Sequence, residues 1–151
     1  MKKLLVVYPG TGGATDRLAA AALRGARDVE DIVCIEKLAR DAVADDVLAC
    51  DGLLLGTPEK FGYMAGLMKD FLERVFYACE GRLEGRPYAV FVSAGNDGTG
   101  AVASIDRIVT GLRLKRVHEP VIVKGTPDSA ALTRCEELGA TLAAGIACGM
   151  F

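Results

Sequence analysis

The chain has 151 residues, a length typical of one domain, and we expect residues 1–151 to form a single domain. It is 51% hydrophobic and 25% charged, which excludes a disordered chain and allows a substantial core. A formal net charge of -2 and the lack of any Lys/Arg cluster argue against nucleic acid as a partner. No apolar run reaches the roughly 18 residues of a membrane span or forms a signal peptide. We therefore expect a cytoplasmic protein that binds neither membranes nor nucleic acid.

Hydrophobic patterning alternates strand and helix five times along the chain. Short continuous apolar runs are typical of buried parallel strands. Apolar residues spaced three and four apart indicate helices, most clearly from Met64 to Phe76. The expected elements, in chain order, are strand Lys3–Tyr8, helix Thr15–Arg27, strand Asp31–Glu36, helix Leu38–Cys50, strand Gly52–Thr57, helix Met64–Phe76, strand Tyr88–Ser93, helix Gly100–Leu114, strand Pro120–Lys124 and helix Ser129–Cys148.

This alternation predicts the fold class. Five strand–helix units with short connections indicate an α/β three-layer sandwich, in which a parallel sheet has helices on both faces. Of the common strand orders, the flavodoxin-like order 2-1-3-4-5 needs only five strands and is favoured. It places a switch of direction between the first and third strands. Ligands of such sheets bind there, beyond the carboxyl ends of the strands.

The five cysteines contain no CxxC pair, and their odd number suits a reducing compartment. We interpret them as small buried hydrophobic residues. The sequence indicates no catalytic triad and no metal ligand set. The cysteines are Cys34, Cys50, Cys79, Cys135 and Cys148.

The loop after the first expected strand is rich in glycine and opens a helix. Backbone N–H groups at a helix start, together with the helix dipole, suit a phosphate group. Glycines allow close approach of the backbone, and Thr11 and Thr15 can add hydroxyl donors. We predict a phosphate site formed by Pro9, Gly10, Thr11, Gly12, Gly13, Ala14 and Thr15.

Several kinds of loop can be compared with this segment. A Walker A loop ends in Gly-Lys-Ser/Thr, and no lysine is present; a Rossmann fingerprint has a third glycine where Thr15 stands. The flavodoxin loop, Ser/Thr-x-Thr-Gly-x-Thr, is similar at Gly13 and Thr15. It has hydroxyl residues where this chain has Gly10 and Gly12, so two side-chain donors are missing while the backbone cradle remains. A plain glycine-rich strand-to-helix turn is the remaining alternative.

The segment from Gly56 to Leu72 reads GTPEKFGYMAGLMKDFL. It resembles the signature of the NAD(P)H:quinone reductase and NADPH-dependent FMN reductase families. There, a strand ends in Gly-Thr/Ser-Pro, a loop with Phe-Gly follows, and a helix opens Met-Ala-Gly-x-Met-Lys/Arg-x-Phe. The resemblance implies an FMN cofactor whose isoalloxazine ring lies along this loop and bonds mostly to backbone groups. The implied positions are Thr57, Pro58, Glu59, Lys60, Phe61 and Gly62.

The loop after the fourth expected strand, Ser93 to Gly100, is also rich in glycine. By the same resemblance it forms the other wall of the flavin site. Asn96 and Asp97 are candidates for bonds to the flavin, or equally for a turn and a cap on the next helix. None of its residues is aromatic, which would leave one ring face open. The candidate residues are Ser93, Ala94, Gly95, Asn96 and Asp97.

The resemblance implies an FMN-dependent oxidoreductase that passes hydride from NAD(P)H through FMN to a quinone, flavin or similar small acceptor. FMN supplies the redox chemistry, so no catalytic side chain is required. An open ring face and a nearly neutral charge favour this enzyme over a flavodoxin-type electron carrier, which is typically acidic and covers the ring with two aromatic residues. A binding module without its cofactor is a third alternative. Family members are commonly dimers or tetramers, so the resemblance also implies a homo-oligomer.

Overall fold

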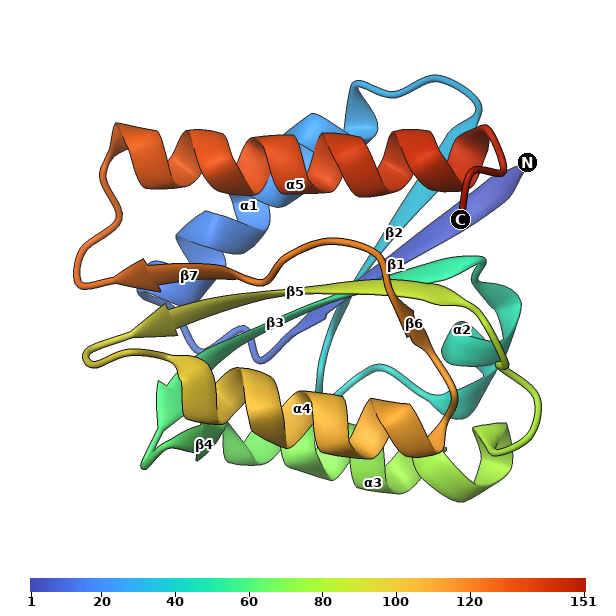
Figure 1. Ribbon diagram of the computed structural model, residues 1–151, viewed down its shortest axis with the longest axis horizontal. Coiled ribbons are helices and arrows are strands. Elements are labelled where there is room, and N and C mark those ends of the chain that lie inside the picture. The colour runs from blue at the N-terminus through green and yellow to red at the C-terminus, as the bar shows by residue number, and fades with distance from the viewer.

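The computed structural model describes residues 1–151 as one twisted sheet between two layers of helices (Figure 1). In chain order the elements are β1 (Lys2–Tyr8), α1 (Ala14–Arg27), β2 (Ile32–Leu38), α2 (Ala44–Ala49), β3 (Gly52–Lys60), β4 (Tyr63–Met64), α3 (Gly66–Cys79), β5 (Pro87–Ala94), α4 (Thr99–Gly111), β6 (Lys115–Arg116), β7 (Val121–Lys124) and α5 (Ser129–Ala147).

The parallel sheet has the order β2-β1-β3-β5, and both β6 and β7 pair with the outer edge of β5. The first pairs with the beginning of β5 and the second with its end. Pro120, which has no N–H to donate, stands between these two short strands and interrupts the edge. The predicted flavodoxin-like α/β class is confirmed. The order differs from the predicted one only in that β6 and β7 divide the fifth position between them.

Helices α1 and α5 cover one face of the sheet, and α2, α3 and α4 cover the other (Figure 1). Leu4 and Val6 belong to the apolar cluster under α1 and α5, whereas Leu5 and Val7 belong to the cluster on the other side. Successive residues of a strand point to opposite faces, so both sides of β1 are buried. This explains its uninterrupted apolar run. None of the helices is both long and apolar enough to cross a membrane.

Helices α1 and α5 approach each other closely because glycine stands at the contact. A Cβ at Gly139 of α5 would lie 1.9 Å from the carbonyl oxygen of Ala22 in α1. No larger residue fits that position unless the helices move apart. The contact fixes α1 over the sheet and thereby fixes the place of its N-terminus, where the predicted phosphate loop ends.

Two of the predicted helices begin later than expected. The second helix begins at Ala44 rather than Leu38, because β2 continues to Leu38 and a turn follows in which the N–H groups of Asp41 and Ala42 donate to the Leu38 carbonyl. Met64 does not begin the third helix. It pairs with Glu59 across a short hairpin, β3–β4.

That hairpin turns at Phe61 and Gly62, with φ of 54° and 69°. Two successive residues of positive φ make the tight turn that suits the twist of paired strands. The third helix then begins at Gly66.

The cysteines only partly follow their prediction. Cys50, Cys79 and Cys135 are buried, and burial raises the pKa of the Cys50 and Cys135 thiols to about 11. Cys34 is half-buried, while Cys148 near the end of α5 is exposed, so its predicted burial is wrong. No group of three or more potential ligating side chains could hold a metal ion.

Candidate functional site

The three predicted loops meet at the carboxyl ends of β1, β3 and β5, around a polar hollow of about 530 Å³. Eleven of its twelve lining residues are among those predicted from the sequence. The lining residues are Thr11, Gly12, Gly13, Ala14, Thr15, Pro58, Glu59, Lys60, Ser93, Ala94, Gly95 and Gly125. This is the switch point of the strand order, where ligands of open α/β sheets bind.

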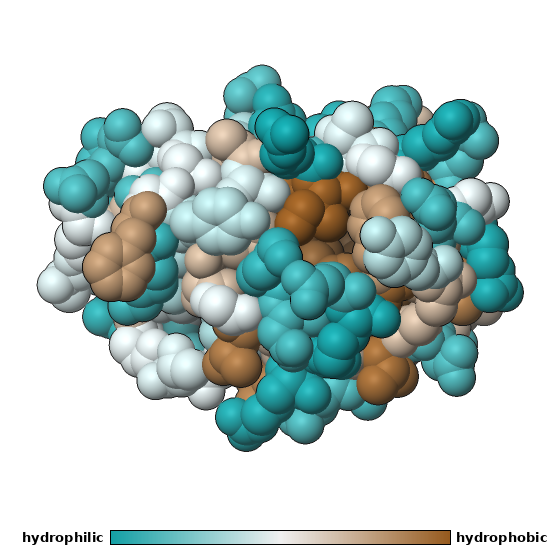
Figure 2. All heavy atoms as spheres, turned by 90° about the horizontal axis from the view of Figure 1, so that it is seen from below, coloured by the Kyte–Doolittle hydropathy of each residue, from teal (hydrophilic) through white to brown (hydrophobic).

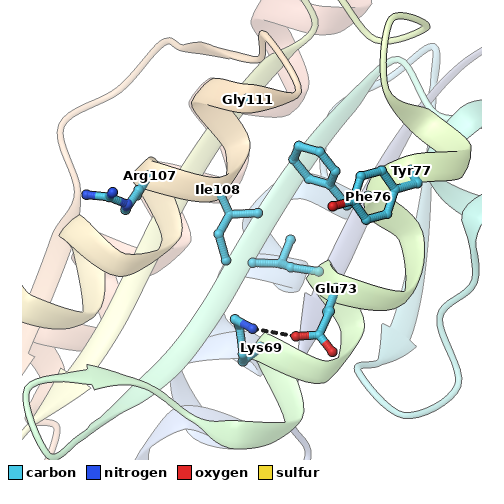
Figure 3. Close-up of a pocket in the computed structure, with 8 residues that line it drawn as sticks. Lys69, Glu73, Phe76, Tyr77, Arg107, Ile108 and Gly111 are labelled. Atoms are coloured by element: carbon cyan, nitrogen blue, oxygen red, sulfur yellow. Dashed lines mark hydrogen bonds and ion pairs between the residues drawn. The ribbon is translucent and has the colours of Figure 1, made fainter.

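A second hollow of about 250 Å³ lies between α3 and α4, far from the strand ends. Figure 2 shows it as a brown recess among polar side chains. In Figure 3, Phe76 and Ile108 face it, and Lys69 pairs with Glu73 beside it, with Nζ and Oε1 2.6 Å apart. It lacks the glycine-rich loops and the helix N-terminus of the first hollow, so we place the functional site at the strand ends.

The start of α1 forms one end of the polar hollow. Its N-cap, Gly13, has φ 78° and ψ -150°, a conformation essentially restricted to glycine, and no side chain caps the helix. The first N–H groups of a helix have no partner within the helix. Here only Gly12 N–H has a side-chain acceptor, Asp16 Oδ2 at 3.2 Å. Uncapped N–H groups and the positive end of the helix dipole suit an anion.

Two buried hydroxyl groups join the first and third loops. Thr15 and Ser93 are 4% and 7% exposed, and Thr15 Oγ1 lies 2.6 Å from Ser93 Oγ. Thr15 belongs to the first turn of α1 and Ser93 to the end of β5. Because β3 lies between β1 and β5, this pair spans the end of β3 at the floor of the hollow.

Hydrogen bonds of the Thr57 hydroxyl hold the second loop in place. This side chain is fully buried; its hydroxyl accepts the N–H of Ala65 at 2.9 Å and donates to the carbonyl of Pro58 at 2.8 Å. Thr57 does not line the hollow. Its hydroxyl supports the loop, and the neighbouring Pro58, Glu59 and Lys60 form the wall.

Glu59 joins the second loop to the third. Its carboxylate accepts the N–H groups of Gly98 and Ala101, both at 3.2 Å, at the N-terminus of α4. Lys60 is exposed and is the only cationic side chain among the lining residues. Phe61 and Gly62, at the tip of the hairpin, do not line the hollow, and the Phe61 side chain is fully exposed.

The third loop contributes less than the sequence predicts. Ala94 and Gly95 line the hollow, whereas Asn96 and Asp97 lie outside the lining. Asp97 accepts bonds from the N–H and the hydroxyl of Thr99, both at 2.9 Å, and these bonds lower the pKa of its carboxyl group. For Asp97 the alternative prediction, a turn before the next helix, is therefore the one that the structure supports.

Gly125, which the sequence prediction omitted, also lines the hollow. It follows β7, and its N–H donates to the carbonyl of Ala94 at 2.9 Å. Its sequence signal was the Gly-Thr-Pro turn directly after the fifth expected strand, which ends at the same edge of the sheet as the other loops.

The residues around the hollow fit FMN. The volume of the hollow is within the roughly 300–1,000 Å³ range of small-molecule sites. The uncapped start of α1 offers backbone donors for a phosphate, and the third loop adds the small residues Ala94 and Gly95 to the lining, besides Pro58–Lys60 of the second loop. Six of the twelve lining residues are Gly or Ala, which gives a ligand access to backbone N–H and carbonyl groups.

Fold and site together define a flavodoxin-like protein with a glycine-rich loop and an uncapped helix start at its switch point. The model of the NADPH-dependent FMN reductase family matches residues 5–125, and the chain belongs to this family. FMN is the cofactor of the family and of this chain. The resemblance found in the segment from Gly56 to Leu72 is therefore confirmed.

Individual relatives fall in two groups. An NAD(P)H dehydrogenase (quinone) of Acidithiobacillus ferrooxidans is 31% identical and aligns with 91% of this chain and 75% of its own. A flavodoxin of Aquifex aeolicus is 29% identical, over 97% of this chain and 88% of its own. The solved structure of a flavodoxin from the domain Archaea has a TM-score of 0.77 at 23% identity, covers 95% of this chain and 98% of that chain, and supports the fold alone.

Proposed function

We propose that the protein is an FMN-dependent oxidoreductase that takes hydride from NAD(P)H and delivers reducing equivalents to a quinone, a flavin or a similar small acceptor. The observation that carries this proposal is that no aromatic side chain covers the wall of the hollow formed by Ala94 and Gly95, which we call the open wall. The third loop has no aromatic residue, and its lining residues Ala94 and Gly95 are small. Phe61, the aromatic residue of the second loop, lies outside the lining. A flat substrate therefore has room to stack on the cofactor.

The chain's own residues bind and orient in this proposal. The backbone of Gly12 to Thr15 and the Thr15 hydroxyl hold the phosphate, while Pro58–Lys60 and Ala94–Gly95 flank the ring. Lys60 adds positive charge at the rim, which favours an anionic cofactor or nucleotide. FMN, when bound, supplies the hydride and electron chemistry. No side chain has to act as an acid or a base.

A flavodoxin-type electron carrier is the second candidate. The similarity to the Aquifex aeolicus flavodoxin and the fold favour it. The net charge of -2 and the open wall favour the oxidoreductase, as does the similarity to proteins named NAD(P)H dehydrogenase (quinone).

Anaerobic mixing of the FMN-loaded protein with NADPH or NADH distinguishes the two functions. We expect the absorption band of the oxidised flavin to bleach, and a quinone added afterwards to restore it. Steady-state rates should follow ping-pong kinetics, because both substrates use the same open face in turn. A flavin that stays oxidised with either nicotinamide, yet accepts single electrons from a reductase partner, would replace the proposal with the carrier.

A further inference from the structure

The hydrogen bond between Thr15 and Ser93 leaves one hydroxyl proton of the pair unused. Each hydroxyl group carries one proton, and a hydrogen bond between the two oxygens uses only one. Their oxygens are 2.6 Å apart, and neither has another hydrogen-bond partner in the chain. Both residues are almost fully buried and both line the hollow. The second proton therefore lacks an acceptor within the protein, at a place where a ligand can supply one.

The location of the pair indicates which proton is free. Thr15 lies in the first turn of α1, one residue after Ala14, among the uncapped N–H groups. Ser93 lies on β5, opposite Pro58 in the sheet register, on the far side of β3. The Thr15 hydroxyl thus shares its surroundings with the backbone donors of the phosphate loop, whereas the one hydrogen bond of the Ser93 hydroxyl to that loop is its bond to Thr15.

We propose that Ser93 is a positioning residue for the FMN phosphate: Ser93 donates its proton to Thr15 Oγ1, and Thr15 donates its own proton to a phosphate oxygen. This inference rests on the FMN site of the proposed function. A hydroxyl group that accepts a hydrogen bond becomes a better donor, and a bond to a charged oxygen is stronger than one between neutral groups. Ser93 thereby compensates in part for the hydroxyl residues that the loop lacks at Gly10 and Gly12.

Affinities for FMN and for riboflavin, which has no phosphate, test this role. We would titrate the wild type, Ser93→Ala, Thr15→Val and the double variant with each flavin and follow the quenching of flavin fluorescence. Thr15→Val should weaken FMN binding about ten- to a hundredfold, the loss expected for one hydrogen bond to a charged group. Ser93→Ala should weaken it about tenfold or less. Riboflavin affinity should stay within about twofold in both variants.

The double variant shows whether Ser93 acts through Thr15. If it does, removing Ser93 after Thr15→Val has no further effect, so the double variant should bind FMN as Thr15→Val does. The ³¹P resonance of bound FMN should shift in Ser93→Ala, and Ser93→Thr, which keeps the hydroxyl group, should bind FMN as the wild type does. Urea unfolding of each variant controls for loss of structure.

Three results would overturn the inference: equal losses for FMN and riboflavin, additive losses in the double variant, or an unshifted ³¹P resonance in Ser93→Ala. Failure of the proposed function has a different signature. If FMN affinities follow the pattern above but NADPH and NADH leave the flavin oxidised, the positioning role of Ser93 stands and the oxidoreductase proposal fails.

Discussion

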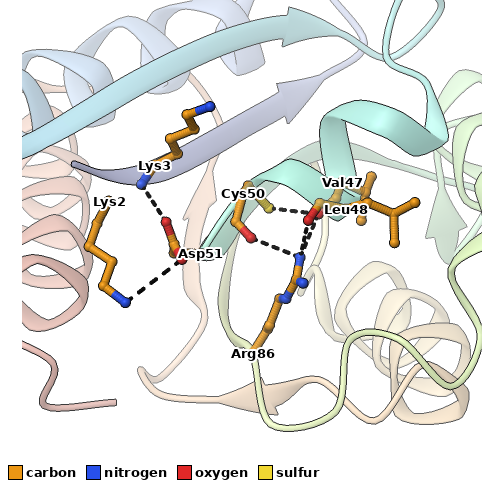
Figure 4. A network of polar contacts seen from close by, with 7 residues as sticks. All are labelled: Lys2, Lys3, Val47, Leu48, Cys50, Asp51 and Arg86. Carbon is orange, nitrogen blue, oxygen red and sulfur yellow. Dashed lines mark hydrogen bonds and ion pairs between the residues drawn. The ribbon is translucent and has the colours of Figure 1, made fainter.

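The connection between α2 and β3, at the amino end of the sheet, and the start of α1, at its carboxyl end, satisfy their polar groups in opposite ways. At the amino end, the Arg86 guanidinium closes the connection between α2 and β3: its Nη1 donates to the carbonyls of Val47, Leu48 and Cys50 at 2.9, 2.9 and 2.8 Å (Figure 4). Beside it, Asp51 accepts the N–H of Lys3 at 2.8 Å. Charged side chains of the chain itself therefore complete this end.

At the carboxyl end, α1 differs from the helices that follow, because it has a glycine N-cap and no side-chain cap. Near the starts of α3, α4 and α5, backbone N–H groups do have side-chain acceptors, on Thr57, Glu59 and Asp128 respectively. Glu59 thereby closes one side of the site. The centre, from Gly12 to Thr15 and from Ala94 to Gly95, remains a polar hollow.

This difference separates structural from functional polar groups. A partner built into the chain stabilises the fold whether or not a ligand is present. Backbone donors that have no acceptor within the chain lower stability slightly, and they gain an acceptor only when a ligand binds. Substitution of Arg86 should therefore change stability without changing binding, whereas substitutions at the start of α1 should also change binding.

The largest effect should come from Arg86→Ala. The change leaves three carbonyl groups without their charged donor, so the free energy of unfolding should fall by about 2–4 kcal/mol. Urea denaturation measures this change, and FMN affinity of the folded protein should remain unchanged. Arg82→Ala is the matched control, because Arg82 is exposed and its bonded nitrogen lies 3.5 Å from the Ala78 carbonyl oxygen. A comparable loss of unfolding free energy in both variants would refute a specific role of Arg86 in stability.

Gly13→Ala should act at the other end. A side chain has room there, since no atom lies within 4 Å of the position of its Cβ, but φ 78° with ψ -150° strains any residue except glycine. Stability should fall by about 1–3 kcal/mol. FMN affinity should fall about tenfold or more as the uncapped N–H groups turn away, while riboflavin affinity falls less.

Gly66→Ala controls for the loss of a glycine as such. Gly66 has no positive φ and no atom within 4 Å of the Cβ position, so neither stability nor FMN affinity should fall. Equal losses of FMN and riboflavin affinity in Gly13→Ala would show that the loop serves the fold rather than the phosphate.

The smallest expected effect is that of Asn96→Tyr, which sharpens the comparison within the carboxyl end. Asn96 is exposed beside the open wall, next to the lining residue Gly95. An aromatic side chain there should hinder stacking of a nicotinamide and slow flavin reduction by NADPH several-fold in stopped-flow experiments. FMN affinity should change less, and Asn96→Ser should behave as the wild type. Unchanged reduction in Asn96→Tyr would mean that the substrate approaches elsewhere.

The sequence predicted the backbone of the site better than its side chains. The loops at Gly13, Pro58 and Gly95 were predictable because glycine-rich turns after buried strands must meet at one edge of a parallel sheet. Thr57 was predictable as a loop residue, but the inward direction of its hydroxyl depends on Ala65, which only the folded hairpin brings within 2.9 Å. Pairing between distant residues, such as Thr15 with Ser93, leaves no trace in local spacing.

The wrong boundaries have a similar origin. Phe61 and Gly62 form a tight turn because β3 continues past the sheet, yet Met64 also fits the helical spacing of the residues after it. Periodicity alone does not separate a short strand from a helix start. The fifth position of the sheet is divided between β6 and β7. Pro120 lies between these two strands, and each of them pairs with only a part of β5.

Titration of the flavin-free protein with FMN tests the central claim most directly, namely that the hollow at the carboxyl ends of β1, β3 and β5 is built for FMN. The account predicts quenching of flavin fluorescence with one FMN per chain, tighter binding of FMN than of riboflavin, and weaker binding of FAD. A well-folded sample that binds no FMN at tens of micromolar would contradict it, because the uncapped start of α1 would then serve only as a turn.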